Sequence, residues 1–128
     1  MHAAYQALKD SPVVTAYAPY GLGGLEYATF TFVVPNGLIT NRNRARPIIQ
    51  FNASSRRKVT VTAHLDDIRV VAREVNGGEH EFISELFAWQ HFPQDRLAPG
   101  TELQLRFNGV NRYAAKVSDI VIWYQTDS

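Results

Sequence analysis

Histidines and aspartates are the residues of this 128-residue chain that would suit metal or acid–base chemistry. Glu79-His80-Glu81 is the densest cluster, but it follows a Gly-Gly pair and is typical of a solvated hairpin tip. His64 with Asp66 and Asp67 lacks the alternating oxygen ligands and the glycine of a calcium loop. The pairs and spacings that hold zinc are also absent from the four histidines, which are His2, His64, His80 and His91. The sequence therefore predicts no metal and no cofactor.

Nucleophilic catalysis requires a serine or cysteine with a base and a group that orients the base. The chain has no cysteine and no GxSxG sequence, and its serines carry no special signal. Two carboxylates for glycoside hydrolysis would be brought together only in space, so the sequence does not exclude them. Small β-sandwiches bind sugars more often than they cleave them. We therefore predict a protein that is not an enzyme and has no catalytic residue.

Charge is distributed in two blocks, although the net charge is only +1. Residues 41–58 hold six cationic residues and no acid, whereas residues 59–95 hold seven acids and two arginines. The basic block could contact phosphate, remain a solvated loop, or dock on an acidic surface such as the 79–85 region of a sister subunit. No aromatic interleaving supports a nucleic-acid partner. The arginines predicted to bind a partner are Arg42, Arg44, Arg46, Arg56 and Arg57.

Aromatic side chains are the second functional signal. Tyr20 and Tyr113 fall in glycine- and asparagine-rich loops, which favours exposure at the surface. Trp123 lies in a segment that is apolar on both faces, which favours the core or a subunit contact, and Trp89 is interpreted as core. In a sugar-binding module, exposed rings of this kind would stack on pyranose faces while amides, Asp or Arg bond the hydroxyls. Tyr20, Tyr113 and Trp123 therefore join the predicted partner-binding residues.

The elements that position these residues are strands. Residues 56–75 form the clearest pattern, because apolar and polar residues alternate on both sides of an Asp66-Asp67 corner. Segment 82–92 fits a helix or a strand, and we favour a strand over 84–92. The remaining predicted strands cover residues 13–17, 25–34, 48–51, 101–108 and 117–125.

About eight strands with polar turns and no convincing long helix predict an all-β, antiparallel β-sandwich of two sheets, in the jelly-roll variant. The expected organisation is a short N-terminal arm over residues 1–12 and a single domain over 13–128. No signal peptide and no apolar run of membrane-spanning length occur, so we expect no secretion by a signal peptide and no membrane partner.

The whole-chain pattern resembles that of tailed-bacteriophage capsid cement, or decoration, proteins of the jelly-roll kind. The features that carry the resemblance are a small cysteine-free chain, the extendable segment MHAAYQALKDSP, long loops and polarised charge. The resemblance implies a structural protein of the virion, assembled in the host cytoplasm. Such a protein clamps neighbouring shell subunits, as a dimer or trimer. The alternative is a carbohydrate-binding sandwich, or the receptor-binding tip of a phage fibre.

Overall fold

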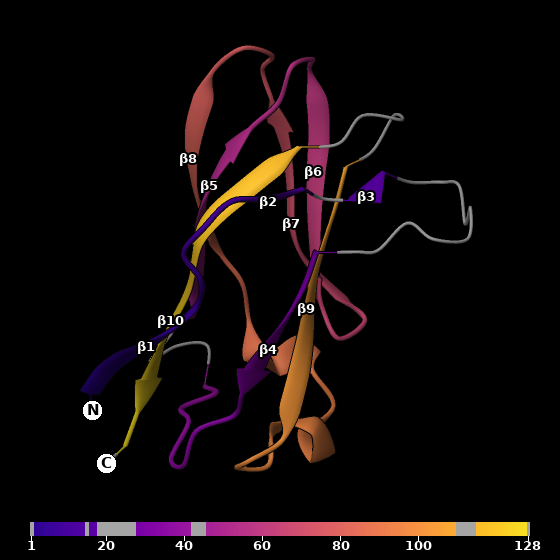
Figure 1. Cartoon of the computed structure of the whole chain (residues 1–128). Helices are drawn as coiled ribbons and strands as arrows, with labels where there is room; N and C mark the ends of the chain where they lie inside the picture. Colours follow the sequence, from indigo (N-terminus) through magenta and orange to yellow (C-terminus); the bar gives the residue numbers. More distant parts are fainter. Residues whose placement is uncertain (1, 15, 18–27, 42–45, 110–114, 128) are drawn as a thin grey trace.

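The computed structural model describes residues 2–14, 16–17, 28–41, 46–109 and 115–127. The described chain is built of strands in two sheets packed face to face, with two short 3₁₀ turns at one end (Figure 1). The all-β sandwich predicted from the alternating sequence is therefore confirmed.

Sheet A contains the first and last strands of the chain. Its strand order is β1-β10-β5-β8, and all of these pairs are antiparallel. A fifth, two-residue strand, β2, pairs with one end of β10. The bounds are β1 His2–Lys9, β2 Val13–Val14, β5 Ile48–Ser54, β8 His80–Leu86 and β10 Lys116–Thr126.

Sheet B is formed by the intervening strands. β6 lies between β7 and β9, and β4 pairs with the other side of β9. The two-residue strand β3 also joins β9, as a parallel pair. The bounds are β3 Ala16–Tyr17, β4 Ala28–Val33, β6 Val59–Leu65, β7 Ile68–Val75 and β9 Glu102–Gly109.

The strand order is that of a jelly roll. Eight of the described strands are longer than two residues. When these eight strands are numbered in chain order, their order is 1-8-3-6 in sheet A and 2-7-4-5 in sheet B. This arrangement results when a long antiparallel hairpin folds over on itself, so that strands distant in sequence become neighbours. The predicted jelly-roll variant is confirmed.

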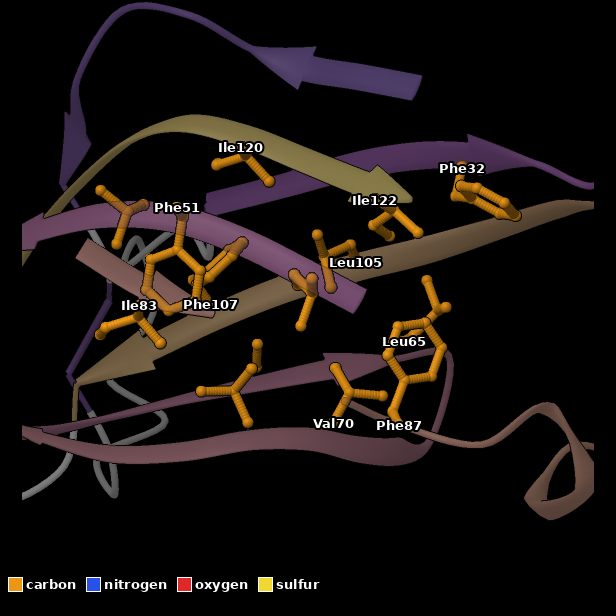
Figure 2. Close-up of a cluster of buried hydrophobic side chains, with 14 of the residues drawn as sticks. Phe32, Phe51, Leu65, Val70, Ile83, Phe87, Leu105, Phe107, Ile120 and Ile122 are labelled. Atoms are coloured by element: carbon orange, nitrogen blue, oxygen red, sulfur yellow. The ribbon is translucent and has the colours of Figure 1, made fainter. Parts of the chain in front are cut away.

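Because side chains alternate along a strand, every second side chain points into the space between the two sheets. On β6, for example, every second residue from Val59 to Leu65 is buried. Figure 2 shows Phe51, Ile83, Ile120 and Ile122 from sheet A facing Leu105 and Phe107 from sheet B. The rings of Phe51 and Phe107 meet edge to face across this layer, with their centroids 4.9 Å apart.

One end of the core is closed by the segment that follows β8. Trp89 is 1% exposed, and its ring contacts those of Phe32, Phe87 and Phe92. The interpretation of Trp89 as core is therefore confirmed. The predicted strand over 84–92 is wrong in its second half, because β8 ends at Leu86 and residues Trp89–His91 form a 3₁₀ turn. The turn lets Trp89 and Phe92, which are three residues apart, both point into the core, whereas an alternating strand would place them on opposite faces.

The N-terminal segment is also different from the prediction. Instead of an arm over residues 1–12, His2–Lys9 forms β1 and pairs with β10 along its length. The sequence favoured an arm because Ala3, Ala4 and Ala7 have weak strand propensity. The backbone hydrogen bonds of β10 supply the order that the side chains do not. Figure 1 shows the result, with β1 lying beside β10 and both termini at the same end of the sheet.

The Asp66-Asp67 corner between β6 and β7 is held by the side chain of Asp66. Its carboxylate accepts hydrogen bonds from the Gln104 backbone N–H and from Arg96 Nε, both at 3.0 Å. The backbone N–H of Asp66 donates to the Gln104 carbonyl at 2.8 Å. These bonds hold Asp66 at a φ of 52°, which is uncommon for a residue with a side chain.

Replacing Asp66 with alanine should therefore destabilise the fold by roughly 1–3 kcal/mol, because two donors lose their acceptor. Urea denaturation measures this change. The matched control is Asp67→Ala. The Asp67 side chain is 99% exposed, so its removal should lower the free energy of unfolding by about 0.5 kcal/mol or less. Asp66→Asn, which tolerates positive φ and keeps one acceptor oxygen, should fall between the two. Equal effects of the two alanine variants would show that the corner does not depend on this carboxylate.

Candidate functional site

The outer face of sheet A carries a row of apolar side chains that crosses four strands. The register places Tyr5 of β1 opposite Trp123 of β10, Trp123 opposite Ile48 of β5, and Ile48 opposite Leu86 of β8. Tyr5 is 58% exposed, Trp123 39% and Leu86 53%. We call these four residues the aromatic row, after Tyr5 and Trp123. Exposed large apolar residues gathered in this way mark a binding surface more often than singly scattered ones.

Tyr5 and Trp123 are the two aromatic residues of this row, on the edge strand β1 and its neighbour β10. Their ring centroids are 5.0 Å apart and their planes are inclined at 44°. This separation is within the range of favourable aromatic pairs, so each ring restrains the other. Because both side chains remain substantially exposed, the pair presents ring surface to solvent instead of filling the core.

A chain of hydrogen bonds runs along the polar row next to the rings. The Trp123 indole N–H donates to Gln50 Oε1 at 2.8 Å. The Gln50 side-chain amide in turn donates to Ser84 Oγ at 3.3 Å. The indole N–H is therefore satisfied within the protein, and the bond fixes how the indole lies on the sheet. Gln50 and Ser84 keep further polar capacity that is exposed beside the rings.

A second polar pair lies one row further along the sheet. Asn52 of β5 donates its side-chain N–H to Asp119 Oδ2 at 2.9 Å, and Ser118 Oγ lies 3.3 Å from the same oxygen. Asp119 sits where the β10 register shifts and has a φ of 52°. Bulges of this kind redirect a side chain out of the regular alternation. Here the bulge brings a carboxylate to Asn52 on the outward face of the sheet.

A hollow of about 210 Å³ lies beside Trp123. It is lined by Trp123 and Gln50 together with Ile48, Gln125 and Arg46, and Arg46 is exposed. The surface around the rings therefore combines apolar area, amide groups, a hydroxyl and a guanidinium group.

The predicted partner-binding residues divide into three groups. Trp123 and Arg46 lie together at this face. Arg56 and Arg57 are exposed in the turn between β5 and β6, away from the aromatic row. The other four lie outside the described residues: Tyr20, Arg42, Arg44 and Tyr113.

The charge blocks are partly engaged within the chain. Lys58 pairs with Glu74 at 3.0 Å, and Arg73 pairs with Glu85 where β7 meets β8 at the edge of the sandwich. Acids of the acidic block therefore have partners in the same molecule. Fewer unpaired acids are therefore left for the predicted docking between the basic block and the acidic block of a sister subunit.

Sequence reasoning missed the residues that complete the face, which are Tyr5, Ile48, Gln50, Asn52, Ser84, Leu86 and Asp119. Tyr5 was assigned to an arm, and the polar residues of β5 have no motif. The available signal was the alternation of β5, in which Gln50 and Asn52 interrupt a run of apolar residues at the outward positions.

The outer face of sheet B has a different character. Cross-strand pairing places His64 of β6 opposite both Arg69 of β7 and Arg106 of β9. We call these three residues the cationic row. The pKa of His64 is lowered from its ordinary value of 6.5, first by partial burial and then by the charges of Arg106 and Arg69, while Asp67 acts in the opposite direction.

The lowered pKa of His64 predicts a loss of stability in acid. Between pH 6.5 and the lower pKa of the folded state, the unfolded chain binds more protons at this residue than the folded chain does. The free energy of unfolding should therefore fall as the pH decreases through this window. Urea denaturation at a series of pH values measures the slope, and His64→Gln should make it shallower. An unchanged slope in His64→Gln would show that other groups dominate the acid response.

Two further classes of site are not found in the described part of the chain. No three His, Cys, Asp or Glu side chains there are grouped so that they could hold a metal ion. None of the helical turns in those residues has the length and hydropathy of a membrane-spanning helix.

No family model matches the sequence, and no curated protein is similar to it. Solved structures with a similar course of the chain include modules that bind carbohydrate. One is the CBM22-1–GH10 portion of xylanase 10B from Clostridium thermocellum in complex with xylohexaose, with a TM-score of 0.46, 14% identity, and 94% of this chain and 26% of that chain covered. This chain therefore spans about a quarter of that protein.

Two others are isolated modules. The xylan-binding CBM22-1 domain of Paenibacillus barcinonensis Xyn10C has a TM-score of 0.44 and 12% identity, over 97% of this chain and 87% of that one. A carbohydrate-binding module of family 29 has a TM-score of 0.46 and 10% identity, over 94% and 88%. Similarities of this extent do not place the chain in a family.

Proposed function

We propose that this chain is a carbohydrate-binding module that holds an oligosaccharide on the outer face of sheet A. The observation that carries the proposal is the exposed Tyr5–Trp123 ring pair with Gln50 hydrogen-bonded to the indole. A pyranose ring has an apolar C–H face and a rim of hydroxyl groups. A ligand of this kind requires flat apolar surface and directional hydrogen-bonding groups side by side, as this face provides.

The direction of the ligand follows from the register. The aromatic row crosses the strands, and the polar row of Gln50 and Ser84 runs parallel to it. Four adjacent strands span about 14 Å from first to last at a spacing of roughly 4.8 Å. A short oligosaccharide lying across the strands would therefore place its ring faces on Tyr5 and Trp123 and its hydroxyls toward the amides. Arg46 would lie along the side of such a ligand, in the hollow beside Trp123.

The same face supports binding without cleavage. Glycoside hydrolysis uses two carboxyl groups that flank the scissile bond. Asp119 is hydrogen-bonded to Asn52 and Ser118, and the outward residues described on β5, β8 and β10 include no second acid. The expectation that the chain is not an enzyme is retained as part of the proposal.

Removing the indole tests the proposal. Isothermal titration with soluble xylan, β-glucan and mannan should identify a ligand, and Trp123→Ala should weaken its binding at least tenfold, or about 1.4 kcal/mol. Trp123→Phe keeps a ring but loses the hydrogen bond to Gln50, so its affinity should be intermediate. Tyr5→Ala should weaken the same ligand.

The matched control is Val33→Ala, which truncates an apolar side chain that is 42% exposed on β4 of sheet B and is not part of the outer face of sheet A. Its affinity should equal that of the unmodified chain. If none of the saccharides binds, or if Trp123→Ala binds as tightly as Val33→Ala, the function assigned to this face is wrong.

A capsid decoration role remains a prediction. Its structural rationale was an arm that reaches neighbouring subunits, and His2–Lys9 is instead paired with β10 of the same chain. The exposed aromatic row would also suit a protein partner, either a second copy or a shell protein. Gel filtration at increasing concentration separates the two, because a dimer or trimer that dissociates in Trp123→Ala would favour a protein contact at this face.

A further inference from the structure

Two arginines flank a histidine on the outer face of sheet B. On β6, the residues on either side of His64 are buried in the core, so His64 itself faces outward. Its neighbours across the strands are Arg69, which is exposed, and Arg106, whose side chain is 41% exposed. Both arginines lower the pKa of His64, so the row disfavours a protonated histidine when no anion is bound.

The nearby acids neutralise only part of this charge. Asp67 Oδ1 lies 3.6 Å from Arg106, and its fully exposed side chain gives a weak, solvent-screened pair. Asp66 is engaged by Arg96 and by the backbone of Gln104. Among the described residues no ion pair involves Arg69. The row therefore keeps net positive charge, and Arg69 keeps its full set of donors.

A hollow of about 500 Å³ adjoins the row at Arg106. Its polar side is formed by Arg96 and Gln104 together with the carboxylates of Asp66 and Asp67, and its apolar walls are formed by Phe92, Pro93 and Ile68. The position of Arg106 is fixed by its hydrogen bond to the Asp66 carbonyl at 3.2 Å. A ligand larger than a single ion would therefore find a positioned guanidinium group at the entrance and room beyond it.

We propose that the cationic row binds an oxyanion, the sulfate or carboxylate group of an acidic ligand, between Arg69 and Arg106 and above His64. Planar guanidinium groups bind such oxygens with paired hydrogen bonds. The bound anion would replace Asp67 as the counter-charge of Arg106. The site lies on the opposite sheet from the aromatic row and does not depend on the carbohydrate proposal.

The test uses inorganic sulfate and dextran sulfate as probes and follows the His64 imidazole signals by NMR. The signals are assigned with His64→Gln. Sulfate should raise the pKa of His64, because a bound anion offsets the two arginines. Since binding then takes up a proton, sulfate affinity should increase as the pH decreases through the raised pKa. Sodium chloride at equal ionic strength corrects for screening.

Arg69→Gln is the decisive variant, because Arg69 has no ion pair to lose within the described residues. It should weaken sulfate binding at least tenfold and, in the free protein, raise the pKa of His64 by removing a neighbouring cation. Lys116→Gln is the control, since it removes the same charge from an exposed position on β10 of sheet A.

The outcomes distinguish the ligand sources. Tight binding of dextran sulfate but not of dextran or free sulfate would identify an acidic polymer as the ligand, and comparable binding of free sulfate would identify a small anion. Both support the site. If neither sulfate nor dextran sulfate changes the His64 signals, or if Lys116→Gln weakens binding as much as Arg69→Gln does, the site does not exist as proposed.

Discussion

The structure depends on β10, which must satisfy two different environments at once. This strand is paired on both sides, with β1 and β2 on one side and β5 on the other. Its inward residues Ile120, Ile122 and Tyr124 belong to the core, and its outward residue Trp123 begins the exposed row. Because side chains alternate along a strand, burying the core residues forces the tryptophan outward. The register that stabilises the fold therefore also creates the candidate site.

Much of the fold could be predicted from the sequence, because it rests on local alternation. The β6–β7 hairpin and β9 show the expected period of two, and their inward residues are buried. The β1 strand could not be predicted, since its alanines have no strand preference and its order comes from the backbone of a strand at the other end of the chain. The turn at Trp89 was hidden because a run of aromatic residues fits a strand as well as a core-filling loop.

The candidate site was less predictable than the fold for the same physical reason. Trp123 was identified as a contact residue, but its partners come from β1, β5 and β8, which pairing alone brings beside it. Nothing in the spacing of Gln50 and Ser84 links them to Trp123. Likewise, Arg69 and Arg106 are brought to either side of His64 only by the order of the strands in sheet B. The two outer faces thus carry opposite kinds of surface, one apolar and aromatic, the other cationic.

The pairing of β1 with β10 also governs when the aromatic row can form. Tyr5 and Trp123 lie near opposite ends of the sequence, and their contact is among the most non-local in the chain. Non-local pairings form slowly, because the entropy cost of loop closure comes before the contacts that offset it. During synthesis, Tyr5 would stay unpaired until β10 had been made. The surface proposed to hold sugar would then appear only in the finished sheet, so that binding would report on completed folding.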